Sequence, residues 1–524
     1  MDRRSFLRTS ALASVGGVAL RGWSQPVLEA LLRSAPNSDR VLVVVQLFGG
    51  NDGLNTVIPL DQYGMLSLLR ANILIPENQA LPLQGTNGAT ALHPAMTGFK
   101  ELWDNGKLGI VQSVGYPDPN FSHFRSTDIW ETASSGLQVL SDGWLGRYLD
   151  TAYPGYPSGY PNGSNPDPIA IRVGGAITAG LQAHGVAMAT AVNNTSNVQN
   201  LTGGVFMDPA MPGCSGDKLA FIRNIQRQTE LYGTVIQAAA NASGCAHSPL
   251  YPSGLQPGAT LANSLKIVAG LICGGLRTRI YWVSDTGFDT HAQQAVAGDP
   301  AQGVHANLLK GISDAIHAFQ QDITQMGVSD RVLGMTFSEF GRRIKSNNSR
   351  GTDHGAAAPM FLFGDRVIPG MLGTNPQIDP NTDGQTNVPM QYDFRSVYSS
   401  VLQQWLCLDQ AGAAQVLMGE HPVLPIIEQQ DCSPVLATGD DLLQIGPNPF
   451  VASTTITYTC VLDGTVSLQV FNSLGQLVAK PVEQQLTAGT YQLDLDLGPM
   501  PAGVYYCRLQ NGPNQVVRNM VKVK

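Results

Sequence analysis

Charged side chains are scarce in this sequence. Asp, Glu, Lys and Arg make up 13% of its 524 residues, against roughly 25% in an average soluble protein. The net charge is -8, and no block of Lys and Arg occurs. Because binding to nucleic acid needs a concentrated basic surface that neutralises phosphates, we exclude nucleic acid as a partner.

The apolar run near the N-terminus, from Ala11 to Leu20, is too short to span a membrane, which takes ~18 residues. It follows Arg3 and Arg4, and paired arginines ahead of a short apolar segment are typical of a twin-arginine export signal. A buried first helix is the alternative. We expect residues 1–37 to be a signal and tether recognised by the twin-arginine translocase.

No CxxC spacing occurs among the seven cysteines, which argues against a structural zinc cluster. In an oxidising compartment some of these cysteines can pair. The pairs close in sequence are Cys214 with Cys245, Cys407 with Cys432, and Cys460 with Cys507. Cys273 lies in an apolar segment, where we expect a buried, unpaired thiol.

Short apolar runs alternate with longer segments in which apolar residues recur every three or four positions. The runs predict strands at Val41–Phe48, Leu108–Val114, Arg279–Val283, Val332–Phe337 and Met360–Phe363. The periodic segments predict helices at Met96–Asn105, Lys218–Asn241, Ala259–Leu276 and His305–Met326. Residues 38–433 therefore read as an α/β domain with a doubly wound, mostly parallel sheet. Residues from about Ala152 to Pro212 read as an irregular insertion over one edge.

The pattern changes after a linker at residues 434–444. From residue 445 to 524, alternating runs separated by turn residues predict a small all-β sandwich. Three motifs, Gly446–Phe450, Val470–Leu477 and Ala502–Tyr506, resemble the C-terminal sorting domain of the type IX (Por) secretion system. The resemblance implies the type IX machinery as a partner, passage through the periplasm, and a final location at the cell surface or outside the cell. A carbohydrate-binding or adhesive sandwich is the alternative.

Polar clusters follow several predicted strands, where the ligands of an open α/β sheet gather. They are Gly49–Asn55, Asp285–His291, Ser338–Arg342 and Thr352–Gly355. Asp289 and His291 are two residues apart, so both can face one cation from an extended segment. With Asp52, Asp353 and His354 they make three carboxylates and two imidazoles, a set that suits two cations of the Zn²⁺ or Mn²⁺ type. An ordinary Asn-Asp-Gly turn is the alternative at Asp52.

Six motifs in order resemble the domain of unknown function 1501 family, which is similar to the alkaline phosphatase superfamily of metal-dependent phosphate and sulfate ester hydrolases. The resemblance covers Asp39 to Pro425, and its motifs are Gly49–Thr56, Ser122–Glu131, Gly143–Arg147, Phe288–Gln293, Ser338–Arg342 and Thr352–Gly355.

The superfamily resemblance implies roles for individual residues. Asp52, Asp353 and His354 would hold one cation, and Asp289 with His291 the other. The third histidine of that second site has no good match, His421 being poorly placed, so Glu339 would complete it.

The resemblance also implies a hydroxyl nucleophile. Ser122 is our prediction, because it lies in the second motif, beyond the strand that ends near Val114, and Ser126 and Thr127 are the alternatives. A nearby cation would activate such a hydroxyl by lowering its pKa. His123 and Arg125 would orient an anionic oxygen, while Arg342 would clamp an anion or pair with Glu339. The sequence thus predicts an exported metal-dependent hydrolase of phosphate or sulfate esters. The alternative is a non-catalytic surface protein that uses the same fold for binding or assembly.

Overall fold

The structure is a computed structural model that divides into two compact units. The larger unit lies within Ser38–Cys432, and the smaller one begins after Cys432. It describes residues 39–162, 165–193, 213–242, 244–430, 432, 442–460, 464–473, 476–487, 489–511 and 514–523. The predicted export signal and linker lie outside these residues, apart from residues 442–444. Within the described ranges, no helix combines the length and the apolarity that a membrane crossing needs.

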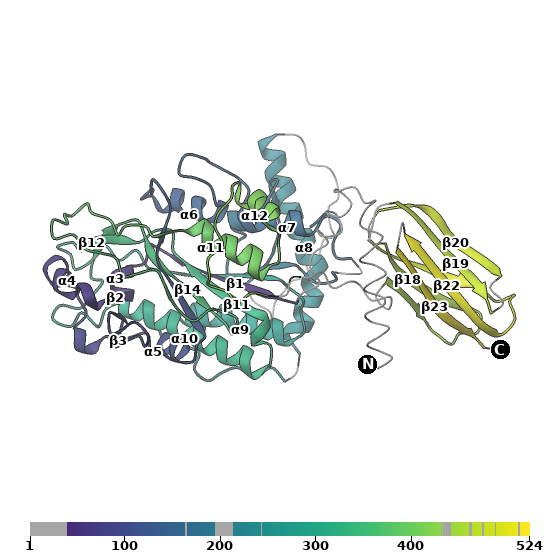
Figure 1. Ribbon diagram of the computed structural model, residues 1–524, viewed down its shortest axis with the longest axis horizontal. Helices are drawn as coiled ribbons and strands as arrows, with labels where there is room; N and C mark the ends of the chain where they lie inside the picture. Colours follow the sequence, from purple (N-terminus) through teal and green to yellow (C-terminus); the bar gives the residue numbers. More distant parts are fainter. Residues whose placement is uncertain are drawn as a thin grey trace, which may run out of the picture. The chain divides into compact units, whose positions relative to one another are not determined.

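The larger unit is built on one mixed, mostly parallel sheet (Figure 1). From edge to edge its strands are β15 (Gly370–Leu372), β5 (Leu108–Gly115), β14 (Ala358–Phe363), β11 (Val332–Phe337), β1 (Val41–Phe48), β10 (Ile280–Thr286), β6 (Ala170–Val173) and β9 (Thr190–Val192), with β16 (Tyr392–Asp393) also on β5. The strands from β11 to β9 are all parallel, whereas β14 is antiparallel to both of its neighbours. The predicted α/β fold class is confirmed.

Helices cover both faces of this sheet (Figure 1). One layer contains α5 (Thr97–Asp104), α8 (Cys214–Ala240), α9 (Ala259–Cys273) and α10 (Val304–Gln325), and the other contains α6 (His123–Thr132), α7 (Trp144–Ala152), α11 (Phe394–Ser400) and α12 (Gln410–Leu417). Alternate side chains of β1 point toward the two helix layers. Val43 and Val45 belong to the aliphatic core with α9 and α10, whereas Gln46 on the opposite face accepts a hydrogen bond from Trp282. Burial on both faces explains the continuous apolar run of β1.

The region predicted to be an irregular insertion contributes to the central sheet. β6 pairs with β10, and β9 pairs with β6. These strands have only four and three residues, which is too few for a periodic hydrophobic pattern. Only their pairing with neighbouring strands identifies them as part of the sheet.

The smaller unit is an antiparallel β structure, as predicted. One sheet contains β17 (Leu443–Gly446), β18 (Ser453–Cys460) and β21 (Gly489–Asp496). The other contains β20 (Leu477–Leu486), β19 (Gly464–Asn472), β22 (Gly503–Asn511) and β23 (Asn514–Lys522). Alternate residues such as Ile456, Val466 and Leu468 form its core.

The disulfides differ in part from the predicted pairs. Cys407 bonds to Cys432 as predicted, but Cys245 bonds to Cys273 across a separation of 28 residues. The prediction that Cys273 stays unpaired is therefore wrong, because the end of α9 lies beside the loop that carries Cys245. Cys460 and Cys507 are buried free thiols on strands of different sheets, so their predicted pairing is also wrong.

Candidate metal centre

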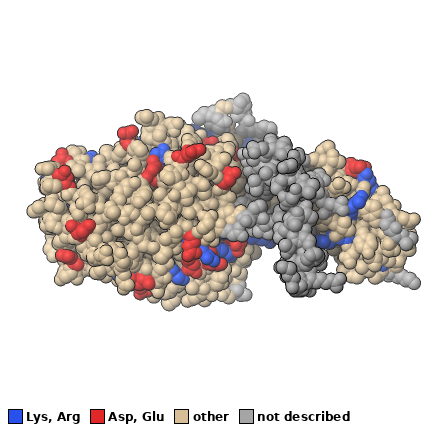
Figure 2. All heavy atoms as spheres, viewed as in Figure 1, with Lys and Arg blue, Asp and Glu red and all other residues tan. Residues whose placement is uncertain are grey.

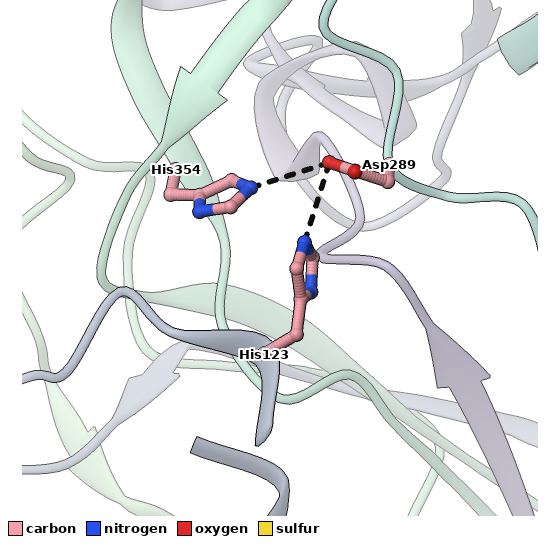
Figure 3. A group of neighbouring side chains, drawn as sticks. All are labelled: His123, Asp289 and His354. Carbon is pink, nitrogen blue, oxygen red and sulfur yellow. Dashed lines mark hydrogen bonds and ion pairs between the residues drawn. The ribbon is translucent and has the colours of Figure 1, made fainter. Parts of the chain in front are cut away.

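Three imidazoles and one carboxylate meet just beyond the carboxyl end of the sheet. Figure 3 shows two of these imidazoles, His123 and His354, with the carboxylate of Asp289. Asp289 follows β10, His123 begins α6, and His354 ends β13 (Thr352–His354), which pairs with β12 (Arg342–Ser346). The Asp289 Oδ1 atom lies 3.4 Å from His123 Nε2, 3.1 Å from His291 Nε2 and 3.2 Å from His354 Nε2. Segments far apart in sequence thus bring three ring nitrogens around one carboxylate oxygen.

The second ring nitrogen of each imidazole faces an oxygen. His123 Nδ1 lies 2.7 Å from Glu339 Oε1, His354 Nδ1 lies 2.7 Å from the Phe121 carbonyl, and His291 Nδ1 lies 3.5 Å from Asp353 Oδ1. A carbonyl oxygen only accepts, so His354 must carry its proton on Nδ1. In the neutral ring Nε2 then presents a lone pair to the centre, as a metal-ligating histidine does.

The electrostatics keep His354 and Asp289 in the forms that bind a cation. Burial lowers the pKa of His354, which favours the neutral ring. Burial opposes the ionisation of Asp289, but the hydrogen bond from the Arg342 guanidinium and its positive charge prevail and hold the pKa of Asp289 below its usual value. A carboxylate and neutral imidazoles are the states that bind a cation.

The arrangement fits a transition metal. Ligands ~2.0–2.1 Å from a tetrahedral ion lie roughly 3.3 Å apart, close to the spacings at Asp289. His291 Nε2 and His354 Nε2 are 2.8 Å apart, a distance at which two lone pairs repel unless a proton or a cation lies between them. His123 Nε2 is buried and has no hydrogen-bond partner in the described part of the chain. The three residues of Figure 3 offer ligand atoms within 4.8 Å of one another.

Arg342 fixes the segments that carry these ligands. Its guanidinium is buried and donates to the carbonyl oxygens of Gly49, Gly50, Phe288 and Thr352, as well as to Asp289 Oδ1 at 2.8 Å. We predicted an anion clamp or a partner of Glu339. In the structure this side chain instead donates its hydrogen bonds to backbone oxygens and Asp289, because three chain segments cross here and their carbonyl groups need donors.

Glu339 lies behind His123 rather than at the centre. Its carboxylate is fully buried and accepts hydrogen bonds from the Gly49 backbone N–H at 2.9 and 3.1 Å in addition to its contact with His123. The structure therefore places this predicted ligand where it orients His123.

Asp52 is also buried and is not a member of the cluster in Figure 3. Arg70 donates to both carboxylate oxygens at 3.1 and 2.8 Å, and Gln294 Nε2 donates at 2.6 Å. Burial opposes the ionisation of Asp52, but these two partners and His305 hold its pKa below the usual value. In the structure the carboxylate of this predicted ligand is thus hydrogen-bonded to a guanidinium and an amide.

The remaining predicted site residues differ in solvent exposure and in their hydrogen-bond partners. Ser122 is exposed at the N-terminus of α6, directly before His123. Asp353 is 57% exposed and accepts a hydrogen bond from Asn347. Arg125 donates to the backbone carbonyls of Ser135, Gly136 and Gln138. Of the alternative nucleophiles, Ser126 is buried and hydrogen-bonded to Tyr116 and to the Glu339 carbonyl, and the Thr127 hydroxyl is buried.

Sequence reasoning missed some of the residues that form this centre. It gave His123 a role in anion binding, whereas the structure places His123 beside Asp289. Arg70 and Gln294 carried no motif, and only their contacts identify them. The spacing of the histidines gave no signal for their convergence, because it depends on three separate crossings of the chain.

Comparisons with known proteins match separate parts of the chain. Residues 254–411 match the family described as "Protein of unknown function (DUF1501)", and residues 444–523 match the family described as "Secretion system C-terminal sorting domain". The sorting domain indicates secretion by the type IX machinery to the cell surface or the extracellular space. No curated protein matches the chain.

Solved structures give distant likenesses. A Bacteroides thetaiotaomicron protein from work on the metabolism of multiple glycosaminoglycans has a TM-score of 0.34 and 10% identity, covering 86% of this chain and 90% of its own. A protein in the alkaline phosphatase superfamily from Vibrio parahaemolyticus has a TM-score of 0.30 and 9% identity, covering 91% and 92%.

A third likeness, with a TM-score of 0.13 and 13% identity, is to PorZ of Porphyromonas gingivalis, a surface component of the type IX secretion system. It covers 19% of this chain and 14% of PorZ, so the chain spans a small part of that protein. Likenesses this distant carry no argument about activity, which depends on the geometry of the centre.

Proposed function

We propose that this chain is a secreted metal-dependent hydrolase of phosphate or sulfate esters, with its cation held by Asp289, His123, His291 and His354. The observation that carries the proposal is the convergence of three imidazole Nε2 atoms on one carboxylate oxygen, at 3.1 to 3.4 Å. Nitrogen and oxygen ligands in this ratio suit Zn²⁺ and related ions. One point of convergence favours one cation rather than the two expected from the sequence.

A bound cation would polarise an ester oxygen and lower the pKa of a nearby hydroxyl. The chain's own residues supply the frame. Glu339 and the Phe121 carbonyl orient two of the rings, and Arg342 keeps Asp289 ionised. The exposed side of the centre, where Asp289 is 47% and His291 44% exposed, leaves room for an ester to approach.

Ser122 is the nucleophile in this proposal. Its hydroxyl is exposed and precedes His123 directly, so the two side chains leave the same turn at the start of α6. The alternative Ser126 has both hydrogen-bonding capacities occupied. We expect Ser122→Ala to lower kcat by at least about 100-fold, because a nucleophile acts only in the chemical step, while metal content stays at the wild-type value. An unchanged kcat would remove Ser122 from the mechanism.

One observation favours the non-catalytic alternative. Arg125 and Arg342, the two cations predicted to bind an anionic oxygen, are both engaged with backbone carbonyls. A protein that uses the centre to bind or assemble would retain the metal and show no turnover.

Metal content and turnover together test the proposal. Purified wild-type protein should contain about one equivalent of a transition metal by elemental analysis, and His354→Ala should lose it. His184→Ala is the matched control, since His184 is 71% exposed and pairs with Asp150. Turnover of aryl phosphate mono- and diesters and aryl sulfates then separates the enzyme from the binding protein. Stable wild-type protein that binds no metal would refute both.

We further propose that the chain reaches the periplasm through the twin-arginine translocase before the type IX machinery exports it. Replacing Arg3 and Arg4 together with lysine should leave uncleaved precursor in the cytoplasm, because the paired arginines are the recognised feature. Arg8→Lys is the control. Cell fractionation and immunoblotting measure where the protein accumulates. Normal export of the double variant would exclude this route.

A further inference from the structure

We infer that Asp52 positions the cation ligands without binding the cation, by fixing the orientation of the Gln294 amide that holds both ligand-bearing segments. The inference rests on the proposed function. It assigns Asp52 a different role from the ligand expected from the sequence.

Gln294 joins the two segments through its side-chain oxygen. Gln294 Oε1 accepts a hydrogen bond from Thr290 Oγ1 at 3.0 Å and another from Thr352 Oγ1 at 3.0 Å. Thr290 lies between the ligands Asp289 and His291, and Thr352 lies two residues before His354. The Gln294 amide therefore binds residues that lie next to, or close to, three of the four proposed ligands.

The backbones of these segments are also in close contact. The Thr352 N–H donates to the Thr290 carbonyl at 3.2 Å. A Cβ atom on Gly351 would lie 2.2 Å from the His291 carbonyl oxygen, so only glycine permits this approach. A rotation of the Gln294 amide would thus be transmitted to both ligand segments.

Asp52 decides which way the amide points. An ionised carboxylate only accepts hydrogen bonds, so the amide NH₂ must face Asp52, and the amide oxygen then faces the two threonine hydroxyls. The reverse orientation would place an oxygen 2.6 Å from a carboxylate oxygen. Arg70, which is fully buried, holds Asp52 in place through both oxygens. Because all of these side chains are buried, water cannot replace the lost partners.

The first test removes the two hydroxyls at constant shape. Thr290→Val combined with Thr352→Val should raise the dissociation constants for Zn²⁺ and Co²⁺ about 10- to 100-fold, the usual effect of losing orienting partners. The visible spectrum of the Co²⁺ form should change as well, since the ligand geometry relaxes. Thr278→Val is the control, because Thr278 is equally buried and donates to the Pro168 carbonyl at the opposite end of β10.

The second test exchanges the polarity of the pair. Gln294→Glu places two carboxylates in contact and should weaken Co²⁺ binding by at least about 10-fold. Adding Asp52→Asn restores a donor opposite an acceptor and should return the dissociation constant to within about threefold of the wild type. If Asp52 were a ligand, the double variant would bind less tightly than Gln294→Glu alone.

The outcomes separate this inference from the proposed function. Wild-type protein that binds no metal refutes both. Wild-type binding with unchanged affinity and Co²⁺ spectrum in the threonine double variant refutes the inference alone. Failure of rescue, with both variants melting near the wild-type temperature, also refutes it. Weakened binding in the threonine variant, with rescue in the double variant, supports it.

Discussion

At the scale of single residues, buried polar groups with several partners determine the geometry of the centre. Arg342 donates to four backbone carbonyls and to Asp289, and so links three chain segments around the ligands. A lysine carries three donors in a different geometry and cannot satisfy the same set.

We predict that Arg342→Lys lowers the free energy of unfolding by about 3 kcal/mol, because carbonyls lose their donors and a buried charge loses its fit. Urea denaturation measures this change. Arg366→Lys is the control, since its exposed pair with Glu428 should contribute less than about 1 kcal/mol. Equal effects of the two substitutions would contradict the role assigned to Arg342.

Glu131 on α6 gives the protein a pH dependence. Burial raises its pKa from 4.5 to about 7, despite hydrogen bonds from the Gly180 N–H and Gln46. The folded state thus favours the protonated carboxyl. The associated stability is fully present below pH 4.5 and is lost as the pH rises through about 7.

We therefore predict that wild-type protein loses on the order of 3 kcal/mol of stability between pH 5 and 8 relative to Glu131→Gln. The measurement is urea denaturation of both proteins at several pH values. The Gln variant cannot titrate at this position, so parallel stability curves would show that Glu131 ionises normally in the folded state.

At the scale of elements, close backbone contact sets the packing of α9 against α10. A Cβ atom on Gly311 of α10 would lie 2.6 Å from the Gly258 nitrogen at the start of α9. Gly270 of α9 also lies within a helix, but a Cβ atom there would find its nearest neighbour, in His247, at 3.9 Å.

We predict opposite effects for two identical substitutions. Gly311→Ala should destabilise the protein by about 1 to 3 kcal/mol, because the helices must separate. Gly270→Ala should stabilise it by up to about 1 kcal/mol, since alanine favours the helix and meets no clash. Thermal unfolding of both variants measures the difference, and a destabilising Gly270→Ala would contradict the packing described.

At the scale of the whole molecule, the two units differ in their covalent links. Both disulfides, Cys245–Cys273 and Cys407–Cys432, belong to the larger unit, whereas the smaller unit has the buried thiols Cys460 and Cys507. A disulfide closing a loop of this length contributes about 2 to 4 kcal/mol.

We predict two thermal transitions in calorimetry, of which a reductant lowers only the one that belongs to the larger unit. The metal-depleted protein should be used, so that the loss of a cation does not contribute. A shift of both transitions, or of the smaller unit's alone, would contradict the assignment of the disulfides.

The sequence by itself determined the strands and helices with strong local patterns. β1 and β11 have the predicted bounds, and the four predicted helices agree with α5, α8, α9 and α10 to within a few residues, because burial on one or both faces fixes the hydrophobic period. It also placed the polar clusters at strand ends, since parallel strands direct their carboxyl ends to one edge.

Only the tertiary structure decided which of those polar residues meet. It brought His123 to Asp289, and it gave the carboxylate of Asp52 to Arg70 and Gln294. It likewise joined Cys245 to Cys273. The physical reason is that each pairing depends on the crossing of segments distant in sequence, and a contact between them leaves no periodicity along the chain.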